Sequence, residues 1–356
     1  MAKARSSTTN PGQPGHIPYL DGWRGMAILN VIFAHFFTKH IPLPFLEGHF
    51  NSGRFGVEMF FCLSGVLMGR ILFLKEENLG RFYFRRCTRI IPAFWVFTAA
   101  YWAYYVLLKG NPIPSTTGFV ASFAFLANYS CAFDISSLPL DLRHLWSISI
   151  EEHCYLLLAL VAYWTRKTKR DAVPVILAFA VASILCVGIH ESFASGDYNS
   201  TYWRTECRLC AVFISAALAV LADRKQGAVL PGNPWVYLLA AIFLNLSIVP
   251  DALKYTLGSA MLAAFVSHLG FIGETWKRVL SSRFLVFIGA ISYSWYLWQQ
   301  PLFGKGTNVF SFPNLACLSV SVLLAFLSFR FLENPVRTGL NRWFDDRKAK
   351  GGTVIS

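Results

Sequence analysis

The chain has 356 residues, of which 55% are hydrophobic and only 14% are charged, and its mean hydropathy is +0.46. A soluble domain carries about 25% charged residues, so this composition excludes an ordinary soluble globular protein. The net charge of +13 would suggest a nucleic-acid partner in a soluble protein. Here the basic residues lie between long apolar runs, and membrane topology explains the charge better.

Apolar runs of roughly the length that a bilayer requires recur from one end of the chain to the other. They predict an all-α integral membrane protein, a bundle of about ten transmembrane helices. The predicted spans are 17–38, 55–75, 90–108, 145–164, 173–190, 205–222, 235–250, 254–271, 284–303 and 313–332. The two runs around Pro250 form a short pair, and an apolar piece at 119–127 is a candidate re-entrant or interfacial helix.

The basic residues are distributed unevenly between the two sides of this bundle. With the N-terminus in the cytoplasm and alternating spans, 23 of the 32 lysines and arginines fall in cytoplasmic segments, 6 in outer loops and 3 in spans. This bias follows the positive-inside rule and predicts that both termini are cytoplasmic. We expect a disordered cytoplasmic tail at 1–16 without a cleavable signal peptide, a membrane domain at 17–337 and a cytoplasmic tail at 338–356.

The first span carries Arg24 near one end and His35 near the other. Eleven helical steps of about 100° bring both side chains to one face, about 16 Å apart along the axis. Separately, the arginine would be an interfacial anchor and the histidine a helix-end imidazole. Together, and preceded by Asp21, they favour a functional stripe that faces a cavity, because such groups are costly in lipid.

The second span contains Glu58 and Ser64 among aromatic residues. Arg54 lies four residues before Glu58, and we expect it to neutralise the carboxylate. Ser64 with the following glycine could simply permit close helix packing.

A run of arginines precedes the third span, with Arg85, Arg86 and Arg89 within about one helical turn. Arginine makes bidentate contacts with phosphates, so this run predicts a site for a donor that carries several phosphates. The alternative is a topological signal that contacts anionic lipid.

The fourth span places Glu151 and Glu152 one to two turns below its outer end. Adjacent carboxylates at this depth, about 10 Å into the span, call for a reason. Because His35 lies at a similar depth, a pair between His35 and Glu151 is geometrically possible. The alternative is a Glu–Arg pair that holds helices together.

Together these stretches resemble acyltransferase family 3, a family of integral membrane O-acyltransferases. The resemblance covers about residues 18–337, and its specificity comes from six motifs in the right order. The matching motifs are LDGWRG followed by His35, GVEMFFCLSG, FYFRRCTRIIP, LWSISIEEHCY, ISYSWYLW in the ninth span and ENPVR after the tenth.

The resemblance implies a ten-helix bundle that moves an acyl group, commonly acetyl, from cytoplasmic acyl-CoA to a hydroxyl. The acceptor is often a sugar of a surface polysaccharide or glycolipid, and the location implied is the bacterial inner membrane; no metal is expected. The family's arginine–histidine motif falls on Arg24 and His35, its membrane glutamate on Glu151, and its basic pair on Arg85 and Arg86. The candidate residues for substrate contact or structural support are Asp21, Glu58, Ser64, Ser149, Tyr155 and Tyr293.

The sequence also departs from the family pattern in two ways. Many members carry a histidine where this chain has Gln299, so a mechanism that needs a second histidine there is doubtful. Many larger members carry an added extracytoplasmic hydrolase-like domain. Its absence from these residues implies direct transfer or a separate partner.

These observations lead to one mechanism and its rivals. Cytoplasmic arginines (Arg24, Arg85, Arg86 and Arg89) would hold the phosphates of coenzyme A. His35 would act as general base on the acceptor hydroxyl, with Glu151 fixing its tautomer. A covalent acyl-enzyme intermediate is the alternative within this class. A transporter or flippase of a lipid-linked sugar is the rival from another class.

Overall fold

The structure is a computed structural model that describes residues 17–37, 50–193, 201–303 and 312–351. The predicted tail at 1–16 lies outside the described residues. Apart from an isolated β-bridge between Phe50 and Leu246, the described parts contain helices and connecting turns only. The predicted all-α class is therefore confirmed.

Helical elements lie over all ten predicted ranges. In chain order they are α1 (Pro18–Ile32) with the π-helical turn η1 (Phe33–Phe37), α2 (Ser52–Met68) with η2 (Gly69–Leu74), α3 (Leu79–Ala103) with η3 (Tyr104–Leu108), α6 (Leu145–Thr168), α7 (Ala172–Phe193), α9 (Thr205–Arg224), α10 (Pro234–Leu244), α11 (Asp251–Leu253) with η6 (Lys254–Gly258) and α12 (Ser259–Ser267), α14 (Arg283–Gln299) with η7 (Gln300–Leu302), and α15 (Phe312–Ser328) with η8 (Phe329–Glu333). Shorter elements connect them: α4 (Thr116–Phe123), α5 (Ala127–Phe133), η4 (Ile135–Ser137), η5 (Leu140–Leu142) and α13 (Glu274–Leu280).

Six helices in the described part of the chain are long and apolar enough to cross a membrane. They are Ser52–Leu74, Leu79–Leu108, Leu140–Thr168, Ala172–Phe193, Thr205–Arg224 and Leu315–Arg347. By contrast α10 has only 11 residues, about 16 Å of helix, which is roughly half the thickness of a bilayer core. The total of ten spans stays a prediction.

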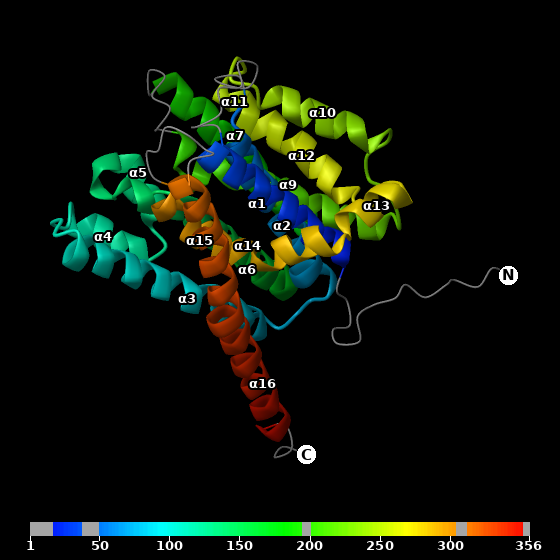
Figure 1. The fold of residues 1–356 in the computed structure, drawn as a ribbon. Helices are drawn as coiled ribbons and strands as arrows, with labels where there is room; N and C mark the ends of the chain where they lie inside the picture. Colours follow the sequence, from blue (N-terminus) through cyan, green and yellow to red (C-terminus); the bar gives the residue numbers. More distant parts are fainter. Residues whose placement is uncertain (1–16, 38–49, 194–200, 304–311, 352–356) are drawn as a thin grey trace.

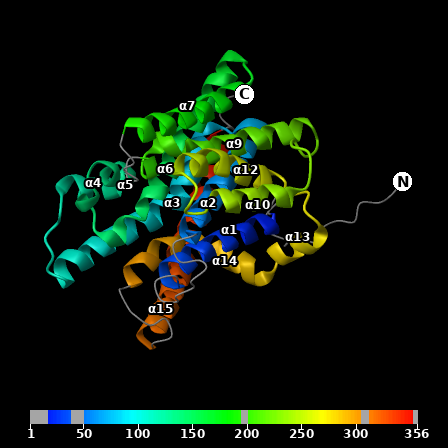
Figure 2. The ribbon, with the colours of Figure 1, turned by 90° about the horizontal axis from the view of Figure 1, so that it is seen from above.

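Close helix contacts at glycine explain part of the LDGWRG motif. A Cβ on Gly22 would lie 1.6 Å from the carbonyl oxygen of Leu280, and a Cβ on Gly289 of α14 would lie 1.9 Å from that of Asp21. Both distances are shorter than any real contact, so only glycine permits this approach. As a result α1 packs closely against the end of α13 and against α14, and it also packs on α2, as Figures 1 and 2 show.

Contacts at the two ends of the helices establish their relative directions. Gly25 approaches Leu285 near the start of α14, whereas His35 contacts Gln299 at its end, so α1 and α14 run parallel. The start of α2 lies beside His35 at Gly53, so α2 runs the opposite way. The end of α6 meets the end of η2, where Arg166 donates to the carbonyl oxygen of Leu72. These directions agree with alternation of the spans.

The last helices form one long rod that begins against α14 and extends beyond the bundle. α15 and η8 continue into α16 (Asn334–Gly351), which projects from the bundle and ends close to the C-terminus (Figure 1). In its second half α16 packs on the first turns of α3, where the rings of Phe84 and Phe344 stack with centroids 4.4 Å apart.

Candidate active site

A cavity of about 70 Å³ lies within the bundle between α1, α2, α3, α6 and α14. Polar side chains from all five helices reach it. Seven residues that the sequence singled out line its wall: Arg24, Ser64, Arg86, Arg89, Glu151, Tyr155 and Tyr293. The tertiary structure thus brings together side chains from motifs that lie up to 269 residues apart in the chain.

One face of α6 lines the length of the cavity. Ser147, Glu151 and Tyr155 are spaced four residues apart, so they stack on successive turns over about 12 Å. Glu151 accepts hydrogen bonds from the hydroxyls of Ser64 and Tyr155, and the bond from Ser64 joins α2 to α6. Above them the hydroxyls of Ser147 and Tyr296 lie 2.6 Å apart. Ser147 and Tyr296 were not among the residues predicted from sequence.

Three arginines gather at the end of the cavity where Tyr155 lies, away from Ser147 and Tyr296. Arg24 from α1 is held by Asp21, with Nη1 2.9 Å from the carboxylate oxygen. Arg86 from α3 lies over the ring of Tyr155, 4.4 Å from its centroid, and Arg89 lies one turn further along α3. Guanidinium groups facing one cavity make a site suited to phosphate groups.

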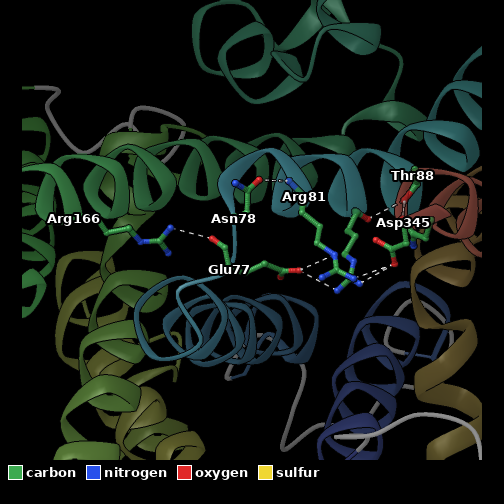
Figure 3. A network of polar contacts seen from close by, with 8 residues as sticks. Glu77, Asn78, Arg81, Thr88, Arg166 and Asp345 are labelled. Carbon is green, nitrogen blue, oxygen red and sulfur yellow. Dashed lines mark hydrogen bonds and ion pairs between the residues drawn. The ribbon is translucent and has the colours of Figure 1, made fainter. Parts of the chain in front are cut away.

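The predicted arginine run is divided between two environments. Arg86 and Arg89 line the cavity, but Arg85 is drawn away from it, 3.0 Å from Glu77 and 3.5 Å from Asp345 of α16. Figure 3 shows Asp345 facing Arg81, which lies 3.0 Å away. The expectation that Arg85 joins the other two is therefore not met, because Glu77 and Asp345 hold its guanidinium outside the cavity.

The cavity ends about one turn short of His35. Tyr296 lines the cavity, and three residues later Gln299 places Oε1 3.0 Å from His35 Nδ1. This spacing corresponds to about 4.5 Å of helix rise. The expected contact between His35 and Glu151 is replaced: Gln299 meets the imidazole, whereas Glu151 meets Ser64 and Tyr155. The π-turn η1 contributes to this difference, because it changes the twist that the sequence argument assumed.

A family model described as an acyltransferase domain matches residues 17–331. The chain belongs to acyltransferase family 3.

Its relatives include bacterial O-acetyltransferases. It is 28% identical over 373 residues to the peptidoglycan O-acetyltransferase OatA of Listeria monocytogenes serovar 1/2a, covering 94% of this chain and 58% of the relative. It is 29% identical to the putative peptidoglycan O-acetyltransferase YrhL of Bacillus subtilis (strain 168), covering 93% of this chain and 56% of the relative. The chain therefore spans a little over half the length of these relatives. No solved structure matches it.

Ser149 is a predicted residue that does not line the cavity. Ser149 belongs to the same stretch as Glu151, but its buried hydroxyl donates to the carbonyl oxygen of Leu145 at 3.1 Å. It therefore satisfies its hydrogen bond within α6, which is consistent with the structural support considered for it.

Glu58 of α2 is part of a buried ion pair. Its carboxylate accepts from Arg208 of α9 and from the hydroxyl of Ser259 of α12, the latter at 2.9 Å. Arg208 lies 3.7 Å from the centroid of the Tyr255 ring. The expected partner was wrong: Arg54 lies over the ring of Tyr202 instead, 5.1 Å from its centroid. The signal available in the sequence was Arg208 itself, a cation inside a predicted span.

Proposed function

We propose that this protein is a membrane O-acyltransferase that moves an acyl group from acyl-CoA to a hydroxyl of a surface polysaccharide or glycolipid sugar. Acetyl is the proposed acyl group, because the relatives are named O-acetyltransferases. The single observation that carries the proposal is the cavity, which has three arginines at one end and stops about one turn from His35 at the other.

The arginine end is the proposed donor site. Coenzyme A carries several phosphates and a thioester at the tip of a flexible arm. Arg24, Arg86 and Arg89 would hold the phosphates through charge-assisted hydrogen bonds. The arm would then follow the α6 face from Tyr155 past Glu151 toward Ser147.

In the proposed reaction His35 removes the proton of the acceptor hydroxyl. The hydroxyl oxygen attacks the thioester carbonyl, a C–O bond forms and the C–S bond breaks. The proton on His35 then passes to the departing thiolate of coenzyme A. Glu151 takes a role different from the one expected from sequence: it holds the hydroxyls of Ser64 and Tyr155 and so shapes the path of the arm.

The proposed topology has ten spans, with both termini on the cytoplasmic side of a bacterial inner membrane. The excess of basic residues in the segments assigned to the cytoplasm supports it. So do the relative directions of α1, α2, α6 and α14. In this topology the arginine end of the cavity lies toward the cytoplasm, where acyl-CoA is available, and His35 lies toward the acceptor.

The proposal is tested with purified protein, labelled acetyl-CoA and a soluble sugar oligomer. We expect Arg86→Gln to raise the KM for acetyl-CoA about 10- to 100-fold, since hydrogen bonds to charged groups contribute about 1.5–3 kcal/mol. Arg85→Gln is the matched control on the same helix, and its KM should stay near the wild-type value. His35→Gln should keep thermal stabilisation by coenzyme A and lose turnover.

Two results would contradict this function. One is a His35→Gln variant with wild-type turnover. The other is wild-type protein that coenzyme A does not stabilise, which would favour the transporter reading.

A further inference from the structure

Gln299 is the side chain that contacts the ring nitrogen of His35. It is fully buried, with 0% of its surface exposed, and its Oε1 lies 3.0 Å from His35 Nδ1. A hydrogen bond at this distance needs one donor and one acceptor, so the amide and the imidazole constrain one another.

Neighbouring acceptors determine which way the amide of Gln299 points. Its Nε2 lies 3.3 Å from Oε1 of Gln300 and 3.5 Å from the carbonyl oxygen of Tyr296. Rotating the amide by 180° would bring its oxygen against the carbonyl oxygen of Tyr296, which can only accept a hydrogen bond. The amide oxygen therefore faces His35, and because it carries no hydrogen it acts only as an acceptor.

The orientation of the amide in turn determines the tautomer of the imidazole. Nδ1 of His35 must carry the hydrogen that Gln299 Oε1 accepts. A neutral imidazole has a single ring hydrogen, so Nε2 becomes the basic nitrogen. This nitrogen points toward the first turn of α2, where a Cβ on Gly53 would lie 3.9 Å from it.

We propose that Gln299 is a positioning residue that holds His35 in the Nδ1–H tautomer and so presents Nε2 as the base. The proposal rests on the function proposed above and names the residue that takes the orienting role first expected of Glu151. When Nε2 takes the proton from the hydroxyl of the sugar, the hydrogen bond that Nδ1–H donates to Gln299 Oε1 is kept. A neutral amide fixes the ring without adding another charge to the membrane interior.

The direct test is nitrogen NMR on protein labelled with ¹⁵N-histidine and reconstituted in lipid, with His35→Gln used to assign the His35 signals. In the wild type at a pH where the ring is neutral, we expect a protonated Nδ1 and an unprotonated Nε2. Gln299→Leu removes the acceptor and should change the ratio of the two tautomers. Gln299→Glu is the matched control, because it has nearly the same size and keeps an acceptor oxygen.

The wild-type ring carrying its hydrogen on Nε2 would overturn the inference, and so would an unchanged tautomer ratio in Gln299→Leu. Kinetics provide the second readout: we expect Gln299→Leu to lower kcat about 100-fold or more, with little change in the KM for acetyl-CoA. The two proposals fail separately. Protein that shows the expected NMR signals but transfers no acetyl group would contradict the proposed function alone.

Discussion

Glu58 and Glu151 are carboxylates inside the same bundle, yet they have different surroundings. Glu58 is 2% exposed and is paired with Arg208, whose guanidinium lies among aromatic rings. Glu151 accepts hydrogen bonds from two hydroxyls and lines a cavity that it shares with Arg86. A costly buried charge can therefore either hold helices together or take part in chemistry. A fixed cation indicates the first role, and an open cavity indicates the second.

The largest expected effect comes from breaking the ion pair. Arg208→Met leaves Glu58 buried without its cation, so we expect the variant to lose about 3–5 kcal/mol of stability. Thermal unfolding of the purified protein measures the loss. The double variant Glu58→Gln with Arg208→Met removes the stranded charge and should recover part of it. An Arg208→Met protein as stable as the wild type would contradict the structural role of the pair between Glu58 and Arg208.

A second variant tests the other carboxylate. We expect Glu151→Gln to lower acetyl transfer about 100-fold, roughly 2.7 kcal/mol of activation free energy, while the melting temperature changes little. The reason is that the charge at this point faces the cavity and holds two of its hydroxyls. The measurement is steady-state transfer alongside thermal unfolding. Full activity combined with a large loss of stability would show that Glu151 holds helices together and does not take part in the chemistry of the cavity.

Tyr155→Phe tests one of the two hydrogen bonds that Glu151 accepts. It removes the hydroxyl that Glu151 accepts from but keeps the ring beneath Arg86. We expect a roughly 10-fold lower kcat/KM, since one hydrogen bond contributes about 1 kcal/mol and slightly more next to a charge. Tyr83→Phe, whose hydroxyl lies 3.5 Å from a backbone oxygen of the same helix α6, is the control and should be nearly neutral. Equal effects of the two substitutions would contradict a role of the Tyr155 hydroxyl in acetyl transfer.

Asp345→Asn tests the separation of the two sets of arginines on α3. Asp345 holds Arg81 and Arg85 at a half-exposed contact, so we expect a cost of at most about 1 kcal/mol in stability. The KM for acetyl-CoA should not change, because neither arginine lines the cavity. A marked change in that KM would show that α16 takes part in donor binding.

The smallest expected effect is on the surface pair between α7 and α9. Hydrogen bonds from Arg224, and then from the backbone N–H of Val173, lower the pKa of Asp171 from 3.8 to about 2. Because the folded pKa is the lower one, the stabilisation is present above about pH 4 and is lost as the pH falls toward 2. Exposure limits it to less than about 1 kcal/mol. Asp171→Asn should therefore be slightly less stable than the wild type at pH 6, with the difference vanishing near pH 2; a constant difference would contradict this origin.

The sequence by itself was sufficient to predict the helical class, the position of each apolar helix and most of the polar residues around the cavity. The physical reason is local: a run of apolar residues and a cation inside it can be recognised without knowing any partner. The same reasoning identified Arg24, His35 and Glu151 as residues that require an explanation.

The tertiary structure alone decided how these residues are paired. His35 meets Gln299 across 264 residues of chain, and Glu58 meets Arg208 across 150. Such pairs depend on which helix faces touch, and close glycine contacts and a π-turn set those faces. Helical periodicity says which side chains share a face of one helix, but not which other helix packs against that face.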